Sequence, residues 1–180
     1  LKKIGVYDEK EHQKLEREKH LEMRMEQALK NGEFVPYFQP KYELTHETIA
    51  GAEALVRWVS PEEGMIFPGE FIPLFEKNGF IVELDLYMFE QVCKMIESWH
   101  KNGYRIIPVS VNMSRGHFLV PNFFDRYKEI LERYDVPKGS IEIELTESLF
   151  LNEISTMTDL VNKIHEVGLR CSIDEFGSGY

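Results

Sequence analysis

The stretch from residue 106 to residue 174 decides the fold, because strand-like and helix-like segments alternate along it. Each strand-like segment is a short run of apolar or small residues, and each helix-like segment carries apolar residues at helical spacing. In order, the segments read IIPVSVN (106–112), PNFFDRYKEILERY (121–134), SIEIEL (140–145), ISTMTDLVNKIHEV (154–167) and LRCSID (169–174). This alternation predicts parallel βαβ units, in which helices cover a parallel sheet.

Two strands and two helices are expected before this stretch. Residues 34–39 and 48–56 are typical of strands, and residues 45–47 between them suit a hairpin loop, so we expect an antiparallel pair. A loop rich in proline and glycine is expected at residues 61–69. The two expected helices run from about residue 69 to 78 and from about residue 82 to 101.

The first 32 residues form a separate segment. Residues 8–31 predict one polar helix with a narrow apolar stripe, which ends at Asn31-Gly32. Two interpretations carry equal weight: a terminal helix packed on its own domain, and a connector from an upstream domain. The N-terminus has neither an initiator methionine nor a signal-like apolar stretch, so we expect an internal piece of a longer protein.

Composition favours a folded domain and excludes some classes of partner. The chain has 180 residues, 43% of them hydrophobic, and a net charge of −10. A nucleic-acid polymer requires a basic stripe, so we expect no such partner, whereas a small phosphorylated ligand can be held through bound cations. No apolar run reaches the roughly 20 residues of a membrane-spanning helix. Cys93 and Cys171 form no CxxC pair, so we expect core thiols in a reducing cytoplasm.

Four expected strands end in an acid or an amide after an apolar or small-residue run. These residues, here called the strand-end group, are Glu53, Asn112, Glu144 and Asp174. In an α/β barrel the active site lies at the C-terminal ends of the strands. Residues two apart share a face of a strand, so the small residues Gly51, Ser110 and Ser172 are expected beneath the group, where they leave room.

The chemistry of the strand-end group indicates a metal site. Carboxylate and amide oxygens are the ligands that Mg²⁺ and Mn²⁺ prefer. Carboxylates gathered in one pocket repel each other unless cations neutralise them. Two metals about 3.5–4 Å apart would remove that repulsion, activate a water and stabilise an in-line displacement at phosphorus. A single acid at a strand end is more often a solvated loop residue or a helix cap, but four such ends together favour a divalent-metal site for phosphodiester chemistry.

Several segments match the motifs of one known family in order and in spacing. They are YFQP (37–40), EALVRW (53–58), FIP (71–73), VSVNMS (109–114), ELTE (144–147) and DEFGSGY (174–180). Together they resemble the EAL-domain cyclic-di-GMP phosphodiesterases, and the resemblance covers residues 33–180. The segment YDEK (7–10), which leads into the charged helix, resembles the end of a GGDEF domain.

The resemblance implies a fold and a domain organisation. The expected fold is α/β, a modified TIM barrel with an antiparallel first strand. It is incomplete in this chain, because a closed barrel takes about 250 residues. Residues 33–180 would be the N-terminal part of an EAL domain, and residues 1–32 a helical connector from an upstream GGDEF-like domain. We expect a cytoplasmic domain, and the sequence leaves open homodimer formation, the sensory input and membrane anchoring of the parent protein.

The resemblance also implies an activity and a set of site residues. The activity is hydrolysis of cyclic di-GMP to pGpG with Mg²⁺ or Mn²⁺, as two ions, in bacterial second-messenger signalling. Gln39, Leu55 and Arg57 would contact the substrate, and the planar donors of Arg57 suit a phosphate. Glu147 would anchor the loop that begins at Phe176. The implied metal ligands are Glu53, Asn112, Glu144, Asp174 and Glu175, of which Glu53, Asp174 and Glu175 are the implied catalytic residues.

Two departures from the family bear on activity. The family has two aspartates where this chain has Asp174-Glu175. The extra methylene moves the carboxylate by about 1.5 Å, whereas metal sites tolerate about 0.2 Å in ligand distance. We therefore expect lower activity, a changed metal preference or a site that only binds. The family's later catalytic lysine and glutamate have no counterpart in residues 1–180, so we expect this chain alone not to be a competent enzyme.

Three functional hypotheses follow from these observations. The first is a metal-dependent phosphodiesterase in the intact parent. The second is a catalytically weakened EAL domain that binds cyclic di-GMP and acts as a regulatory module. The third is a purely structural dimerisation domain, which predicts no dinucleotide binding at all.

Overall fold

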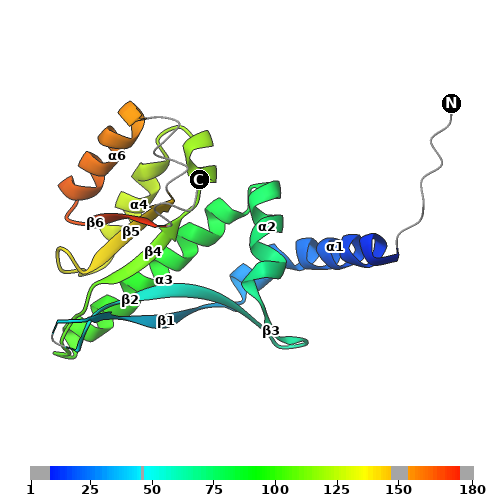
Figure 1. Ribbon diagram of the computed structural model, residues 1–180, viewed down its shortest axis with the longest axis horizontal. Helices are drawn as coiled ribbons and strands as arrows, with labels where there is room; N and C mark the ends of the chain where they lie inside the picture. Colours follow the sequence, from blue (N-terminus) through cyan, green and yellow to red (C-terminus); the bar gives the residue numbers. More distant parts are fainter. Residues whose placement is uncertain (1–8, 46, 147–153, 175–180) are drawn as a thin grey trace.

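Figure 1 shows the computed structural model, which describes residues 9–45, 47–146 and 154–174. The described helices are α1 (Glu9–Lys30), α2 (Pro68–Asn78), α3 (Ile81–Lys101), the 3-10 helix η1 (Arg115–Leu119), α4 (Phe123–Leu131) and α6 (Ile154–Glu166). The described strands are β1 (Phe34–Glu43), β2 (Thr48–Ser60), β3 (Gly64–Ile66), β4 (Val109–Met113), β5 (Ile141–Thr146) and β6 (Arg170–Asp174).

The described strands form one sheet in the order β1-β2-β4-β5-β6, with β3 paired to β2 beside this path (Figure 1). Strands β1 and β2 pair antiparallel, as the hairpin between them requires. Strands β2, β4, β5 and β6 pair in parallel. The α/β fold with an antiparallel first strand is thereby confirmed, as is the mainly parallel, incomplete barrel.

One face of the sheet is apolar and lies against helices. Alternate residues of a strand point to opposite faces, so the odd-numbered residues of β4 and β5 share this face. All six are buried: Val109, Val111, Met113, Ile141, Ile143 and Leu145. Helix α3 contacts β1 and β4 on this side, and α4 contacts α3. The even-numbered residues of the same strands point the other way, and they include the polar residues Ser110, Asn112, Glu142 and Glu144.

Helix α1 contacts the domain from Arg17 onward, while its N-terminal end extends away from it (Figure 1). Leu21 and Ala28 are buried, whereas Leu15 is 50% exposed. Beside this helix lies a buried aromatic cluster with ring centroids 4.9–6.0 Å apart, made of Phe34, Trp58, Phe71 and Phe75. The packing supports the interpretation of a helix docked on its own domain, and the connector role and the domain boundary at residue 33 stay predictions.

Several expected boundaries were wrong. The strands expected at 34–39 and 48–56 run on to Glu43 and Ser60. The strand expected at 106–112 begins at Val109, because Pro108 has no N–H to donate to a ladder. The helix expected at 121–134 is only Phe123–Leu131, since Asn122 is left-handed with φ 55° and therefore lies outside it. The loop expected at 61–69 contains β3, which pairs with the extended end of β2.

Both cysteines are free thiols, with Cys93 buried and Cys171 half-buried. Neither has a disulfide partner in the described part of the chain, in keeping with the expected core thiols. Among the described helices, none combines the length and the apolar character that crossing a membrane requires.

Candidate functional site

The strand-end group lies on one face of the sheet, opposite the helices. Asn112 pairs with Glu144 across β4 and β5, and Glu53 pairs with Ser110, two residues before Asn112. Paired residues of neighbouring strands share a face, as do residues two apart on one strand. Asp174 is the last residue of β6 and pairs with Thr146, two residues beyond Glu144. The sheet therefore places Glu53, Asn112 and Glu144 on neighbouring strands of this face, with the backbone of Asp174 further along β6.

Glu53 is not at the end of its strand, contrary to the prediction. Strand β2 continues to Ser60, and beyond Glu53 it pairs with β1 as far as Trp58 and with β3 from Trp58 to Ser60. Its parallel pairing with β4, however, stops at Ala54. Glu53 therefore lies where the parallel part of the sheet ends, which is the position that an α/β barrel uses for its active site.

Glu53 and Asn112 are joined by a hydrogen bond. The Asn112 Nδ2 donates to Glu53 Oε1 over 3.1 Å. The bond uses the amide NH₂ of Asn112 and not its oxygen Oδ1, which is the atom that would ligate a hard cation. Glu53 is half-buried and Asn112 is exposed, so both side chains can be reached from solvent.

Glu144 is the buried acid of the group, at 6% exposure. Its Oε1 accepts a hydrogen bond from Nζ of Lys41, which reaches it from β1. A buried carboxylate loses its hydration, and a cation in contact with it offsets that loss. This contact could not be predicted from the sequence, because 103 residues separate the two side chains and nothing in the local pattern joins them.

The space expected beneath the strand-end group is present. A cavity of about 110 Å³ is lined by Lys41, Gly51, Ser110, Glu142 and Arg170, among others. Ser110 Oγ donates to the backbone oxygen of Ala52 at 3.4 Å, and Ser172 Oγ donates to Glu142 Oε1 at 2.8 Å. The small residues thus keep the strands close together and leave room for longer side chains from β1 and β6.

The oxygen atoms of the described site residues are of the kind that ligates a hard cation. Glu53, Asn112 and Glu144 offer carboxylate and amide oxygens on one face, which is the donor type of Mg²⁺ and Mn²⁺. No group of three or more His, Cys, Asp or Glu side chains within the described residues is close enough to hold a metal. The side chain of Asp174, together with Glu147, Glu175 and the loop from Phe176, lies outside the described residues, so the predicted ligand set is described only in part.

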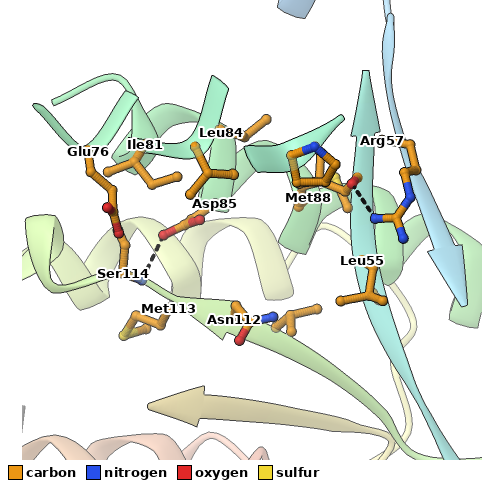
Figure 2. Close-up of a pocket in the computed structure, with 15 residues that line it drawn as sticks. Leu55, Arg57, Glu76, Ile81, Leu84, Asp85, Met88, Asn112, Met113 and Ser114 are labelled. Atoms are coloured by element: carbon orange, nitrogen blue, oxygen red, sulfur yellow. Dashed lines mark hydrogen bonds between the residues drawn. The ribbon is translucent and has the colours of Figure 1, made fainter. Parts of the chain in front are cut away.

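A second cavity lies between strands β2 and β4 and helices α2 and α3, and it contains predicted substrate contacts (Figure 2). Its volume is about 280 Å³. Leu55, Arg57 and Asn112 line one side of it, and Ile72 and Met88 bring α2 and α3 to the other. The third predicted contact, Gln39, is exposed on β1 and pairs with Glu53 across the β1–β2 ladder.

Arg57 is held at the rim of this cavity. Its Nη1 donates to the backbone oxygen of Val56 at 2.8 Å, drawn as a dashed line in Figure 2. Its guanidinium carbon lies 5.8 Å from the ring centroid of Tyr37, within range of a cation–π contact. These contacts orient a half-buried guanidinium beside Leu55 while further N–H groups remain for an anion.

Asp85 of α3 holds the backbone that follows Asn112 in place. No sequence pattern indicated this role. Its Oδ2 accepts from the backbone N–H of Ser114 at 2.8 Å and lies 3.1 Å from Nε2 of the buried His117 (Figure 2 shows the first bond). The Tyr127 hydroxyl lies 3.1 Å from the same Nε2, and burial raises the pKa of Tyr127. This network holds the turn from β4 into η1, so the position of Asn112 depends on a helix that precedes it.

Comparisons with known proteins agree with these observations. The model of the family described as EAL domain matches residues 22–180 and so begins within α1. The signaling protein YkoW of Bacillus subtilis is 33% identical over 159 residues, which cover 88% of this chain and 20% of that protein. The bifunctional diguanylate cyclase/cyclic di-GMP phosphodiesterase MucR of Pseudomonas aeruginosa is 31% identical over 156 residues, covering 87% of this chain and 23% of MucR.

A solved structure shows the same architecture. The PaMucR phosphodiesterase in complex with c-di-GMP superposes with a TM-score of 0.82 at 30% identity, over 89% of this chain and 65% of that one. The present chain spans only about a fifth to a quarter of the length of the two curated relatives.

Proposed function

This chain belongs to the EAL domain family, and on that premise we propose that the protein carrying it hydrolyses cyclic di-GMP to the linear dinucleotide pGpG with Mg²⁺ or Mn²⁺. Two relatives are named as acting on this substrate: MucR and the cyclic di-GMP phosphodiesterase NbdA of Pseudomonas aeruginosa, which is 31% identical over 163 residues. The proposal extends their activity to the parent of this chain.

One observation carries the proposal. Glu53 and Asn112 are hydrogen-bonded on neighbouring parallel strands, and Glu144 pairs with Asn112 on the next. This places oxygen donors from three strands on one face, and Asn112 together with Arg57 also lines the cavity between β2, β4 and the helices α2 and α3. An acidic face next to an oriented guanidinium suits a phosphodiester bridged to the protein by cations.

Each side chain has a role in this proposal. Glu53, Asn112, Glu144, Asp174 and Glu175 would hold two divalent cations, which when bound supply an activated water and neutralise charge on the phosphate. Arg57 would bind a non-bridging phosphate oxygen through its fixed guanidinium. Leu55 and Gln39 would orient the dinucleotide from β2 and β1, and Glu147 would anchor the loop that begins at Phe176.

The test is a product assay on the purified full-length protein with Mn²⁺. We expect cyclic di-GMP to be converted to pGpG, and Glu53→Ala to lower kcat/KM at least about 100-fold, since it removes a metal ligand. The matched control is Glu62→Ala, an exposed acid in the turn after β2, which should leave the rate unchanged. A folded wild-type protein that leaves cyclic di-GMP uncut would refute the enzymatic proposal.

A second function, a binding and regulatory module, is favoured by one sequence observation. Glu175 stands where the family has an aspartate, and its longer side chain is expected to weaken the second metal. A module of this kind binds cyclic di-GMP tightly without turnover. Calorimetry with cyclic di-GMP, run beside the product assay, separates the two functions, and recovery of turnover in Glu175→Asp would favour the module.

We also propose that α1 joins the domain to an upstream GGDEF-like domain. MucR is named as a bifunctional diguanylate cyclase and phosphodiesterase, so one relative combines both activities in one chain. The sequence of the full-length protein before residue 1 tests this directly, because a GGDEF motif there is the expected result.

A further inference from the structure

Lys41 is a cation built into the acidic face that the proposed function assigns to metals. Its Nζ donates to Glu144 Oε1, and its side chain is 41% exposed while that of Glu144 is 7% exposed. Lys41 lies on β1, the antiparallel strand, whereas the strand-end group comes from the parallel part of the sheet. No motif of the family resemblance assigned it a role.

The sheet is shaped to let Lys41 reach Glu144. Its partner across the β1–β2 ladder is Gly51, which has no side chain to block the path. Ser110, small and buried, lies on β4 between β2 and Glu144's strand. Lys41, Gly51 and Ser110 line the same cavity of about 110 Å³. The small residues beneath the strand-end group therefore accommodate a lysine side chain.

The charges on this face explain why such a lysine is needed. Glu53, Glu142 and Glu144 share the face, and Glu144 is the most buried of the three. A buried carboxylate without a partner is strongly unfavourable, so Lys41 stabilises the fold when no metal is present. A divalent cation that ligates Glu144 would take over this neutralisation and would be repelled by the ammonium group beside it.

We propose that Lys41 is the internal counter-ion of Glu144 and competes with a divalent cation for that carboxylate. The inference rests on the proposed metal site and adds a residue that sets its affinity. In the metal-free protein Lys41 holds Glu144. In the metal-bound protein Lys41 gives up or shares the carboxylate, so the measured metal affinity is lowered by the cost of displacing it.

The test uses the full-length protein and Mn²⁺ alone, without nucleotide. Free Mn²⁺ is followed by electron paramagnetic resonance, and Tm is measured in chelator and in Mn²⁺. For Lys41→Met we expect a Kd for Mn²⁺ lower by about tenfold or more, because one repelling charge is gone. We also expect a lower Tm in chelator and a larger rise in Tm on adding Mn²⁺.

Three further variants make the result decisive. Lys19→Met removes the same charge from an exposed position on α1 and should change neither Kd nor Tm. Lys41→Arg keeps the charge and should restore a wild-type Kd. Lys41→Gln keeps an N–H donor without the charge, so it should bind Mn²⁺ more tightly even if Lys41→Met does not fold.

The outcomes separate this inference from the proposed function. If the wild-type protein binds Mn²⁺ and neither Lys41→Met nor Lys41→Gln binds it more tightly, Lys41 does not compete with the cation. That result would overturn this inference but not the proposed metal site. Absence of Mn²⁺ binding in every folded variant would overturn both.

Discussion

Gly51 is the residue at which the close approach of β2 and β4 is most sensitive to substitution. A Cβ atom there would lie 2.8 Å from the backbone oxygen of Pro108, closer than atoms can pack without a shift. That same oxygen accepts a hydrogen bond from Ala52 at 2.9 Å, so it cannot move freely. A substitution at Gly51 would therefore act two residues from Glu53 and opposite Lys41 of β1.

We expect Gly51→Ala to lower the free energy of unfolding by about 1–3 kcal/mol, as overpacking does. The measurement is urea unfolding followed by tryptophan fluorescence. Gly69→Ala is the matched control, since a Cβ there meets no atom within 4 Å and alanine favours the helix α2. Equal stability of the two variants would show that the strands are not in contact as described.

The two thiols offer a second test at the residue scale. Burial raises the pKa of Cys93 to about 12 and, with the nearby Glu142 charge, the pKa of Cys171 to about 11. Reaction requires the thiolate, so at pH 8 we expect no alkylation of Cys93 and slow alkylation of Cys171 by iodoacetamide. Peptide mass mapping measures each thiol separately, and both should react fully in denaturant. Rapid native labelling of Cys93 would contradict its place in the core.

Some residue-scale features could be read from the sequence and others could not. The shared face of Glu53, Asn112 and Glu144 could be expected from the period of a strand, which also places Gly51 and Ser110 on that face, whereas the position of Glu53 inside β2 could not. The Lys41–Glu144 ion pair and the Asp85–Ser114 bond join residues 103 and 29 positions apart. Such contacts depend on how the strands and helices pack, which no local pattern encodes.

At the scale of elements, α1 is the helix whose role the sequence left most open. Leu21 is fully buried and Leu15 is 50% exposed on the same helix. Leu21→Ala should cost about 2–5 kcal/mol of unfolding free energy, and Leu15→Ala less than about 0.5 kcal/mol. Chemical denaturation of both variants measures the difference. Similar small losses would mean that α1 is a free connector and does not dock on the domain.

Electrostatic contacts also tie α1 to the domain. Glu63, in the turn between β2 and β3, accepts hydrogen bonds from Arg17, from His20 at 2.9 Å, and from Arg24. The pKa of Glu63 lies below its ordinary value. The main cause is the hydrogen bond from Arg17, followed by the hydrogen bond from His20. A lowered pKa means that the contact stabilises the fold above the ordinary pKa of the unfolded chain and is lost as pH falls through the lowered value.

We therefore expect Glu63→Gln to reduce stability at pH 7 by up to about 1 kcal/mol, because solvent screens this partly exposed cluster. The difference from wild type should shrink as pH falls below about 4, where the unfolded chain takes up its proton. Urea unfolding at pH 7, 5 and 3.5 measures this trend. A constant difference at all three values would exclude the ion pairs as its source.

The elements themselves could largely be predicted. Strands and helices from β4 to β6 followed from the alternation of their patterns, and the antiparallel hairpin from the turn at residues 45–47. The length of β2 and the presence of β3 could not be predicted, because both depend on the pairing of Trp58 with Ile66 after the chain has turned back. Helix α4 was shortened by the left-handed Asn122, a local feature that helical spacing does not reveal.

On the scale of the whole molecule, the two faces of the sheet differ in chemical character. The apolar face is closed by α3 and its neighbours, and the polar face gathers acids from β2 and β5 and the amide Asn112 from β4, with Asp174 at the end of β6. The fold class was predictable because the βα alternation and the family motifs agree. The arrangement of charges on the polar face, with Lys41 among the acids, emerges only when the strands are in register.

We propose that this acidic face uses divalent cations to cut cyclic di-GMP. The most direct measurement follows cyclic di-GMP by chromatography with the full-length protein, first stripped with a chelator and then supplied with Mn²⁺. We expect no cleavage after stripping and production of pGpG once Mn²⁺ is restored. Cleavage at the same rate in the presence of the chelator, or none in Mn²⁺ by a protein shown to be folded, would contradict it.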